Sequence, residues 1–349
     1  MTEQCKQPEF SGGSVLVTGG AGFIGSHFTK RLLAADDIAR VTVLDALTYA
    51  GHRANLGEAY LCERFDFVEG NILDAALVDE LVARHDAVVH FAAESHVDRS
   101  FLQGGTFLAT NVLGTHTLLE AARRHAVRRF VHVSTDEVYG PLASGRADEH
   151  APLRPSVPYA ASKAASDLVA LSACQTYGVP VCVTRSSNNY GPAQHPEKII
   201  PLFVTNLLKG ATVPLHGDGG HVRNWLHVAD NSAGIELVLR HGTPGEVYNI
   251  AGGTDLTNRQ LTQLLLNACG AGWDAVTQVP DRPANDRRYA MDWAKIHRLG
   301  YRPVVPLEAG LAATVEWYRD HPDRWAPLKR NPRAPLPRVG LRPHPQRQG

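Results

Sequence analysis

Cysteine is scarce in this sequence. The 349 residues include five cysteines, which are scattered, odd in number and never spaced Cys-x-x-Cys. They indicate neither a disulfide framework nor a zinc site. The 17 histidines form no His-Glu-x-x-His motif, so we expect no bound metal.

Net charge and long hydrophobic runs are absent as well. The 35 Lys and Arg residues balance 35 Asp and Glu residues, which argues against a nucleic-acid or membrane-surface partner. No apolar run approaches the roughly 18 residues of a membrane-spanning helix. Residues 1–10 lack the apolar block of a signal peptide, so we expect a cytoplasmic protein. The length suits one large domain or two smaller ones.

A glycine-rich turn follows the first apolar segment. Residues 14–18 resemble a short buried strand, and Gly19, Gly22 and Gly25 come next with Gly-x-x-Gly-x-x-Gly spacing. In a dinucleotide-binding turn the first glycine allows the tight bend. The second lets the backbone approach a pyrophosphate, and the third lets helix pack on strand. The helix-like segment through Leu33 would offer its free N-terminal amides to the phosphates.

An acidic residue completes this fingerprint. The apolar segment 41–44 ends in Asp45, about 20 residues beyond the last glycine, as the dinucleotide fingerprint requires. A carboxylate there accepts hydrogen bonds from the adenosine ribose hydroxyls and would repel a 2′-phosphate. The sequence therefore predicts dinucleotide binding and favours NAD over NADP.

Strand-like and helix-like segments alternate along the rest of the first half. Strands are expected at 65–70, 87–91 and 129–133, with a helix at 110–125. This succession predicts an α/β fold, a Rossmann-like doubly wound parallel sheet with a smaller C-terminal α/β substrate-binding domain. The expected divisions are a loose leader at 1–13, the NAD-binding domain at 14–187 with 224–250 returning to it, the substrate-binding domain at 188–223 and 251–326, and a poorly ordered Pro- and Arg-rich tail at 327–349.

Two carboxylates follow the strand at 129–133. The run from Ser134 to Gly140 includes Thr135, Asp136 and Glu137, at the sheet edge where ligands bind in open α/β folds. A hydroxyl and two adjacent carboxylates can serve acid/base chemistry. Taken alone, however, Asp-Glu at a strand end is more often helix-cap chemistry and solvated charge.

Tyr159 and Lys163 lie four residues apart in a helix-like segment that Pro158 helps to start. This spacing places both side chains on one helix face, where the ammonium can stabilise a phenolate and lower the tyrosine pKa. The same spacing occurs on many helices without chemistry. Downstream of a dinucleotide fingerprint, it points to a catalytic pair.

Together these motifs resemble the extended short-chain dehydrogenase/reductase family. The resemblance rests on the glycine pattern, the run 92–100, the run 134–140, Tyr159 with Lys163, and the Asn-Asn-Tyr-Gly-Pro segment at 188–192. It covers about residues 14 to 326. Within that family the Thr-Asp-Glu triplet is similar to the 4,6-dehydratases that act on dTDP-glucose, whereas the related sugar-nucleotide 4-epimerases lack the Asp-Glu pair.

The resemblance implies a reaction and a role for each catalytic residue. Tyr159, held by Lys163, would take the C4 hydroxyl proton while hydride passes to NAD+, with Thr135 bonding the same oxygen. Glu137 would remove the C5 proton, and protonated Asp136 would give its proton to the departing C6 hydroxyl. Hydride return to C6 would complete dTDP-4-keto-6-deoxyglucose, a step of deoxysugar biosynthesis. Such a pair needs environments that separate the two carboxyl pKa values.

The resemblance also implies two sets of binding residues and a homodimer. Helices at 106–125 and 156–177 would pair across a two-fold axis as a four-helix bundle. The expected NAD-binding residues are Gly19, Gly22, Phe23, Ile24, Gly25, Asp45, Thr48, Asn71, Ile72, Ala92, Ala93, Thr110, Tyr159, Lys163 and Asn189. The expected substrate-binding residues are Ser95, Thr135, Asn188, Lys198, Ile199, Pro214, His216, Arg223, Asn258, Arg282 and Asn285.

Some positions depart from the family pattern, and some questions stay open. Ala284-Asn285 replaces a usual Gly-His pair, Asn71 replaces a usual aspartate, and Ala46 stands where a larger or polar side chain is common. The residues named suit thymine and uracil equally, and only the resemblance favours thymidine. A sugar-nucleotide 4-epimerase, a 5,6-dehydratase and a non-catalytic NAD sensor remain the alternatives.

Overall fold

A seven-stranded parallel sheet forms the centre of the larger domain. The computed structural model describes residues 9–282 and 284–330. The strand order is β10-β6-β5-β4-β1-β2-β3. In sheets of this order a dinucleotide binds at the carboxyl ends of the strands, where the order reverses between the first and fourth strands. The strands are β1 (Gly13–Thr18), β2 (Ile38–Asp45), β3 (Phe65–Glu69), β4 (Ala87–His90), β5 (Arg129–Thr135), β6 (Val181–Ser186) and β10 (Val247–Ile250).

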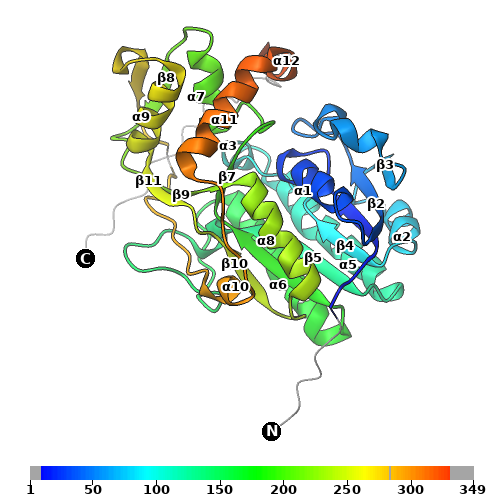
Figure 1. Cartoon of the computed structure of the whole chain (residues 1–349). Helices are drawn as coiled ribbons and strands as arrows, with labels where there is room; N and C mark the ends of the chain where they lie inside the picture. Colours follow the sequence, from blue (N-terminus) through cyan, green and yellow to red (C-terminus); the bar gives the residue numbers. More distant parts are fainter. Residues whose placement is uncertain (1–8, 283, 331–349) are drawn as a thin grey trace.

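Helices cover both faces of this sheet (Figure 1). Strand side chains alternate between faces, so Val15 and Val17 pack with one set of helices and Leu16 packs with the other. Helices α1 (Phe23–Leu33) and α8 (Val228–His241) contribute to the first core. Helices α2 (Ala75–Val82), α5 (Thr115–Arg124) and α6 (Pro158–Tyr177) contribute to the second. The predicted doubly wound fold is confirmed.

The helix expected at 110–125 has a more complex form. The chain is helical as α4 (Gly104–Leu108), a π-helical segment (Ala109–Gly114) and α5, after the short helix α3 (Val97–Ser100). A π segment widens the helix, and such segments are frequent at functional sites. Here it holds Asn111, whose side-chain oxygen accepts from the Glu94 amide at 2.8 Å. The loop after β4 is thereby fixed to the helix.

The smaller lobe has its own sheets and core. Strands β11, β9 and β7 form one sheet, and β12 pairs with β8 in another. Tyr190, Phe203, Trp225, Leu311 and Tyr318 are among the side chains of its core. Its strands are β7 (Asn188–Tyr190), β8 (Val213–His216), β9 (Val222–His227), β11 (Thr254–Thr257) and β12 (Val276–Val279), and the C-terminal half also holds helices α7 (Ile199–Leu207), α9 (Asn258–Cys269), α10 (Ala294–Arg298), α11 (Leu307–Asp320) and α12 (Pro322–Arg330).

The chain returns to the main sheet later than expected. Residues 224–227 belong to β9, which pairs with β7 and β11 in the small sheet. Helix α8 and strand β10 are the parts that lie on the main sheet, and β10 pairs with β6 at its edge. The return therefore starts at Val228 rather than at residue 224, because β9 completes the small sheet first.

The predicted leader and tail are wrong at their inner ends. Phe10 is buried and its amide donates to the Arg240 carbonyl, so residues 9–13 are packed. Residues 327–330 belong to α12, where the Lys329 ammonium donates to the Thr205 hydroxyl at 2.9 Å. The remaining parts of both predicted segments lie outside the described residues. Among the helices that the structure describes, none combines the length and apolarity needed to cross a membrane.

Candidate active site

The glycine-rich turn lies between β1 and α1, at the carboxyl edge of the main sheet. Gly19 has φ +70°, and a Cβ there would stand 2.5 Å from the Ala92 nitrogen. A Cβ at Gly25 would stand 2.3 Å from the Gly19 carbonyl oxygen. No side chain caps the N-terminus of α1, where Gly22 is the N-cap. The turn therefore requires glycine and leaves helix amides available to an anion.

One cavity runs along this edge from the glycine turn to Lys198. It is lined by all of the residues that were expected to bind NAD. The expected substrate-site residues Ser95, Thr135 and Lys198 line it as well, together with Glu137. Residues from the ends of β1, β2, β4, β5 and β6 thus meet in a single cleft.

Asp45 is held at the edge of the cleft by backbone amides. Its Oδ2 accepts from the Ala21 amide at 2.9 Å and its Oδ1 from the Leu47 amide at 2.8 Å. Burial raises the pKa of Asp45, and these two amides oppose that rise. The carboxylate therefore has a fixed orientation beside the position expected for the ribose.

Asp136 and Glu137 follow β5 in a 3₁₀ turn (Asp136–Tyr139). The cap of this turn is the Thr135 hydroxyl, which accepts from the Glu137 amide at 3.3 Å. The capping alternative for the two carboxylates is therefore wrong. Because a neighbouring hydroxyl fills that role, neither carboxylate serves as the cap. Glu137 lines the cleft, whereas the Asp136 side chain is buried and its Oδ1 accepts from the Thr135 hydroxyl at 3.4 Å.

The two carboxyl groups have different electrostatic surroundings. Burial and the adjacent Glu137 raise the pKa of Asp136 to about 7. Burial also raises the pKa of Glu137, but Lys198 and Arg223 oppose that rise. Arg223 opposes the rise at both carboxyls, so the two differ in that the charge of Glu137 favours a proton on Asp136 whereas Lys198 favours an ionised Glu137. This difference has the direction that an acid/base pair needs.

Tyr159 and Lys163 lie on the first two turns of α6, where Pro158 is the first residue. The Lys163 ammonium donates to the Val133 carbonyl at 2.8 Å, and burial lowers its pKa to about 8. Burial and the charge of Glu137 raise the pKa of Tyr159 above its ordinary value, against an opposing hydrogen bond with Thr135. The expected depression of the tyrosine pKa by Lys163 is therefore absent here, because burial dominates.

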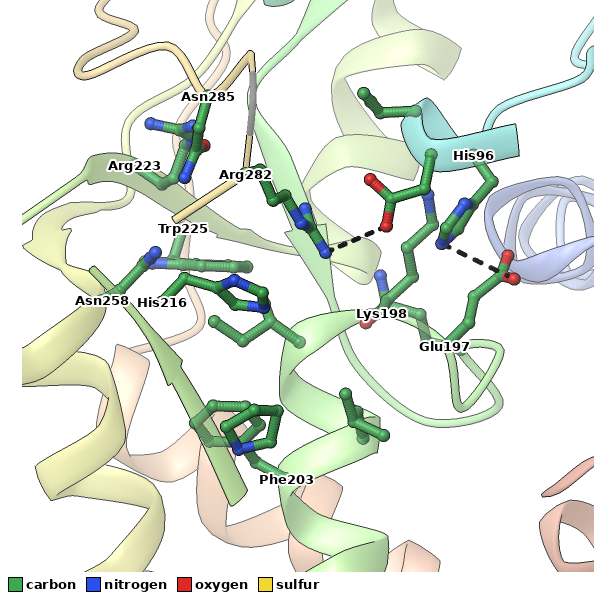
Figure 2. Close-up of a pocket in the computed structure, with 16 residues that line it drawn as sticks. His96, Glu197, Lys198, Phe203, His216, Arg223, Trp225, Asn258, Arg282 and Asn285 are labelled. Carbon is green, nitrogen blue, oxygen red and sulfur yellow. Dashed lines mark hydrogen bonds and ion pairs between the residues drawn. The ribbon is translucent and has the colours of Figure 1, made fainter. Parts of the chain in front are cut away.

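A second cavity, shown in Figure 2, opens between the lobes. Glu197 and Lys198 line both cavities, so the two adjoin there. Asn188 lines neither of them, and its buried side-chain oxygen has no hydrogen-bond partner in the described part of the chain. Its assignment to the substrate stays a prediction. The expected substrate residues that line the second cavity are Lys198, Ile199, Pro214, His216, Arg223, Asn258, Arg282 and Asn285.

Two arginines project into this second cavity, Arg223 from β9 and Arg282 from the segment after β12 (Figure 2). An Arg223 Nη donates to the Asn285 side-chain oxygen at 3.3 Å, and Asn285 donates to Asp281 at 2.8 Å. The unusual Asn285 thus anchors an arginine. Arg282 forms an ion pair with Asp98 at 3.3 Å.

Several lining residues were missed by the sequence reasoning. Glu197 is the most connected of them, with an oxygen 3.7 Å from His96 Nε2 and 3.5 Å from Arg99 Nε. Its position directly before Lys198 was a usable signal. The apolar members give no motif, because ordinary core residues look the same in sequence. The missed residues are His96, Val97, Asp98, Gln194, Glu197, Leu202, Phe203 and Trp225.

Comparison with known proteins identifies relatives of this arrangement. A family model described as GDP-mannose 4,6 dehydratase matches residues 16–314. A dTDP-glucose 4,6-dehydratase of Streptomyces antibioticus is 58% identical over 328 residues, which cover 92% of this chain and 97% of the relative. The chain belongs to the dTDP-glucose 4,6-dehydratase family.

Solved structures agree with this family. The dTDP-glucose 4,6-dehydratase DesIV of Streptomyces venezuelae, solved with NAD and TYD bound, has a TM-score of 0.89 and 56% identity, covering 90% of this chain and 99% of that one. A UDP-glucose 4-epimerase of Thermus thermophilus, in complex with NAD, has a TM-score of 0.81 and 34% identity, covering 88% and 99%. The fold is shared with epimerases, so the dehydratase assignment depends on sequence similarity and on the site.

Proposed function

We propose that the chain converts dTDP-glucose to dTDP-4-keto-6-deoxyglucose with NAD as a tightly held cofactor. The observation that carries the proposal is the pair Asp136 and Glu137 beside Tyr159. Burial raises the pKa of both carboxyls, and the charge of Glu137 adds to the rise at Asp136 while Lys198 opposes the rise at Glu137. Oxidation alone needs neither carboxyl. Loss of water needs both an acid and a base.

The first cavity fits NAD. The positions where a Cβ would collide, Gly19 and Gly25, leave a backbone cradle for a pyrophosphate at the start of α1. Asp45 would accept from the ribose hydroxyls. Ala92 and Ala93, which have small side chains, line the wall of the cleft. When bound there, NAD supplies a hydride acceptor at the sugar C4 and later a donor at C6.

Tyr159 and Thr135 would act at C4. Tyr159 would take the proton of the C4 hydroxyl, and the Thr135 hydroxyl would bond the same oxygen. Because the tyrosine pKa is raised in this structure, the phenolate needs nearby positive charge to form. Lys163, on the same helix face, supplies one such charge.

Glu137 and Asp136 would act at C5 and C6. Once C4 is a ketone, the C5 hydrogen is acidic, and Glu137 would remove it as general base. Asp136 would give its proton to the C6 hydroxyl, which leaves as water. Glu137 would then return a proton to C5. The raised pKa of Asp136, about 7, matches the general-acid role.

The second cavity would hold the nucleotide diphosphate. Arg223, Arg282 and Lys198 are its cations, and arginine suits the geometry of phosphate oxygens. The printed names of the close relatives support thymidine as the nucleoside. Location in the cytoplasm stays a prediction, supported by the four described cysteines, which are all free.

Incubation with dTDP-glucose in deuterated water tests this function. We expect a 4-keto-6-deoxy product that carries deuterium at C5, without added NAD if the cofactor is retained. An inverted C4 hydroxyl with no loss of water would instead establish an epimerase. A 5,6-unsaturated product would establish a 5,6-dehydratase. Bound NAD without any turnover would support a sensor.

The homodimer is part of the proposal. Leu108, Leu113, Leu168 and Tyr177 are between 54% and 61% exposed and lie on the segments from α4 to α6, which pack side by side. Their exposure supports a second copy covering this face. Sedimentation velocity should give a dimer, and Leu113→Glu with Leu168→Glu should give a monomer.

A further inference from the structure

A buried ion cluster lies one helical turn beyond Lys163. Asp167 on α6 is fully buried, and its Oδ2 accepts from Arg185 Nε on β6 at 2.9 Å. Its Oδ1 lies 3.3 Å from His132 Nε2 on β5. None of these groups lines the two ligand cavities. The proposed chemistry therefore leaves the cluster unused.

The cluster extends away from the cleft through hydrogen bonds. Arg185 Nη1 donates to the Tyr139 hydroxyl at 2.9 Å, and that hydroxyl donates to the Asn249 side chain at 2.7 Å. Asn249 then donates to the carbonyls of Ala147 and Asp292. Asp167 is thus anchored on its far side, with its position fixed relative to the active-site helix.

The two neighbouring histidines carry no positive charge near neutral pH. Burial lowers the pKa of His132 to about 4 and that of His90 well below its ordinary value. Lys163 and Arg185 are then the buried cations. Asp167 is ion-paired with Arg185 and lies four residues after Lys163 on α6, where its charge favours the Lys163 ammonium. A buried ammonium without a nearby anion tends to lose its proton.

We propose that Asp167 is a positioning residue that keeps Lys163 charged, with Arg185 fixing the carboxylate in place. The spacing of four residues on α6 puts Asp167 and Lys163 on one face. Asp167 opposes the loss of the Lys163 proton that burial favours. The inference rests on the proposed function, in which the ammonium supports the Tyr159 phenolate.

Other titratable groups face this region from the elements around α6. Asp136 and Glu137 act on Tyr159 and raise its pKa. They lie at the cleft end, whereas Asp167 lies below Lys163 in the protein interior. The groups considered are Tyr159 and Asp167 on α6, His90 on β4, His132 on β5, Arg185 on β6, and Asp136, Glu137 and Tyr139 in the 3₁₀ turn.

The test is the pH profile of Asp167→Asn, which keeps the shape and removes the charge. Without this carboxylate the Lys163 ammonium should lose its proton at a lower pH. The alkaline limb of the pH profile of kcat should therefore move down by about one pH unit, since a unit charge nearby typically shifts a pKa by that order. Turnover should fall about tenfold at high pH and little at pH 6. A limb that stays in place would overturn the proposal.

Two further variants separate charge from structural damage. Asp167→Glu restores the charge and should restore the limb. His132→Gln, which replaces a neutral partner of Asp167, should leave the limb in place. A downward shift in both Asp167→Asn and His132→Gln would mean general damage and would overturn the proposal.

A direct titration of Lys163 tests the role of Asp167 without relying on catalytic activity. In protein labelled with ¹³C-lysine, the Lys163 signal should titrate at lower pH in Asp167→Asn than in the parent chain. If Asp167→Glu is the only variant that folds, its Lys163 signal can still be titrated, and Lys163 should have the same pKa there as in the parent chain. If the parent chain makes no 4-keto-6-deoxy product, the proposed function fails while the titration still decides the role of Asp167.

Discussion

The two cavities of the molecule are built in different ways. The cofactor cleft is made of strand ends and a glycine turn, where neighbouring backbone atoms lie so close that a Cβ would collide with them. The second cavity includes long charged side chains from β9 and from the segment after β12, Arg223 and Arg282, which are already paired with Asn285 and Asp98. The first site depends on backbone shape, and the second on side-chain charge that its own partners partly neutralise.

The largest effect should come from breaking the backbone shape. Gly25→Ala would place a methyl 2.3 Å from the Gly19 carbonyl oxygen, so either the turn or α1 must shift. We expect loss of bound NAD and of all turnover, measured by the absorbance of cofactor released from purified protein. Gly104→Ala is the matched control, because nothing lies within 4 Å of a Cβ there, and it should keep its NAD.

The next effect concerns the acid pair, of which Glu137 lines the cofactor cleft. Glu137→Gln should abolish deuterium exchange at C5 while some C4 oxidation persists, a loss of about 10² to 10⁴ in turnover. Asp136→Asn should keep exchange and slow the loss of water. Glu80→Gln, at an exposed position, is the control. Unchanged C5 exchange in Glu137→Gln would show that another group is the base.

The contrast between the cavities also explains what the sequence predicted. Gly19, Gly25 and Asp45 stand at fixed spacings along one βαβ unit, so local geometry alone determines what they build. The second cavity joins residues from α7, β8, β9 and the segment after β12, and only the family resemblance assigned Arg223 or Arg282 to it. Glu197 was missed, because the direction of its side chain depends on tertiary packing. The assignment of Asn188 to the substrate stays a prediction.

The electrostatic expectations divide in a similar way, into one that followed from local chemistry and one that did not. A need for different surroundings at Asp136 and Glu137 followed from the chemistry that the pair must perform. In the structure burial raises the pKa of both, and some of their charged neighbours differ. The pKa of Tyr159 did not follow from its spacing to Lys163, since burial is its largest cause. The extent of burial is a property of the whole fold, and periodicity along one helix does not report it.

The pH dependence of stability should show the raised pKa of Asp136. A carboxyl whose folded pKa lies above its unfolded value contributes stability below the unfolded pKa, and this contribution is lost as pH rises through the folded value. For Asp136 the window runs from 3.8 to about 7. The melting temperature should therefore fall less across that window in Asp136→Asn. The expected difference is a few degrees.

Smaller effects should follow from loosening the anchor of Arg223. Asn285→Ala removes the acceptor of its 3.3 Å hydrogen bond and should raise the KM for dTDP-glucose about threefold to tenfold, with kcat nearly unchanged, since one hydrogen bond to a charged group contributes about 1 kcal/mol. Asn285→Asp keeps the acceptor but adds negative charge near the diphosphate, so its KM should rise further. Equal KM values in both variants and the parent would remove Asn285 from substrate binding.

The smallest expected effect is tighter rather than weaker binding. It tests whether the ion pair between Arg282 and Asp98 limits ligand binding in the second cavity. Asp98 holds Arg282 at 3.3 Å, and both side chains are about one-third exposed or more. Such exposed pairs contribute little to stability, but a diphosphate must compete with Asp98 for the arginine. Asp98→Asn should therefore bind dTDP about twofold to threefold more tightly in calorimetry, with unchanged NAD content, and the gain should shrink at high salt. Weaker binding would mean instead that Asp98 positions Arg282 for the phosphates, and the two cavities would then both depend on preset geometry.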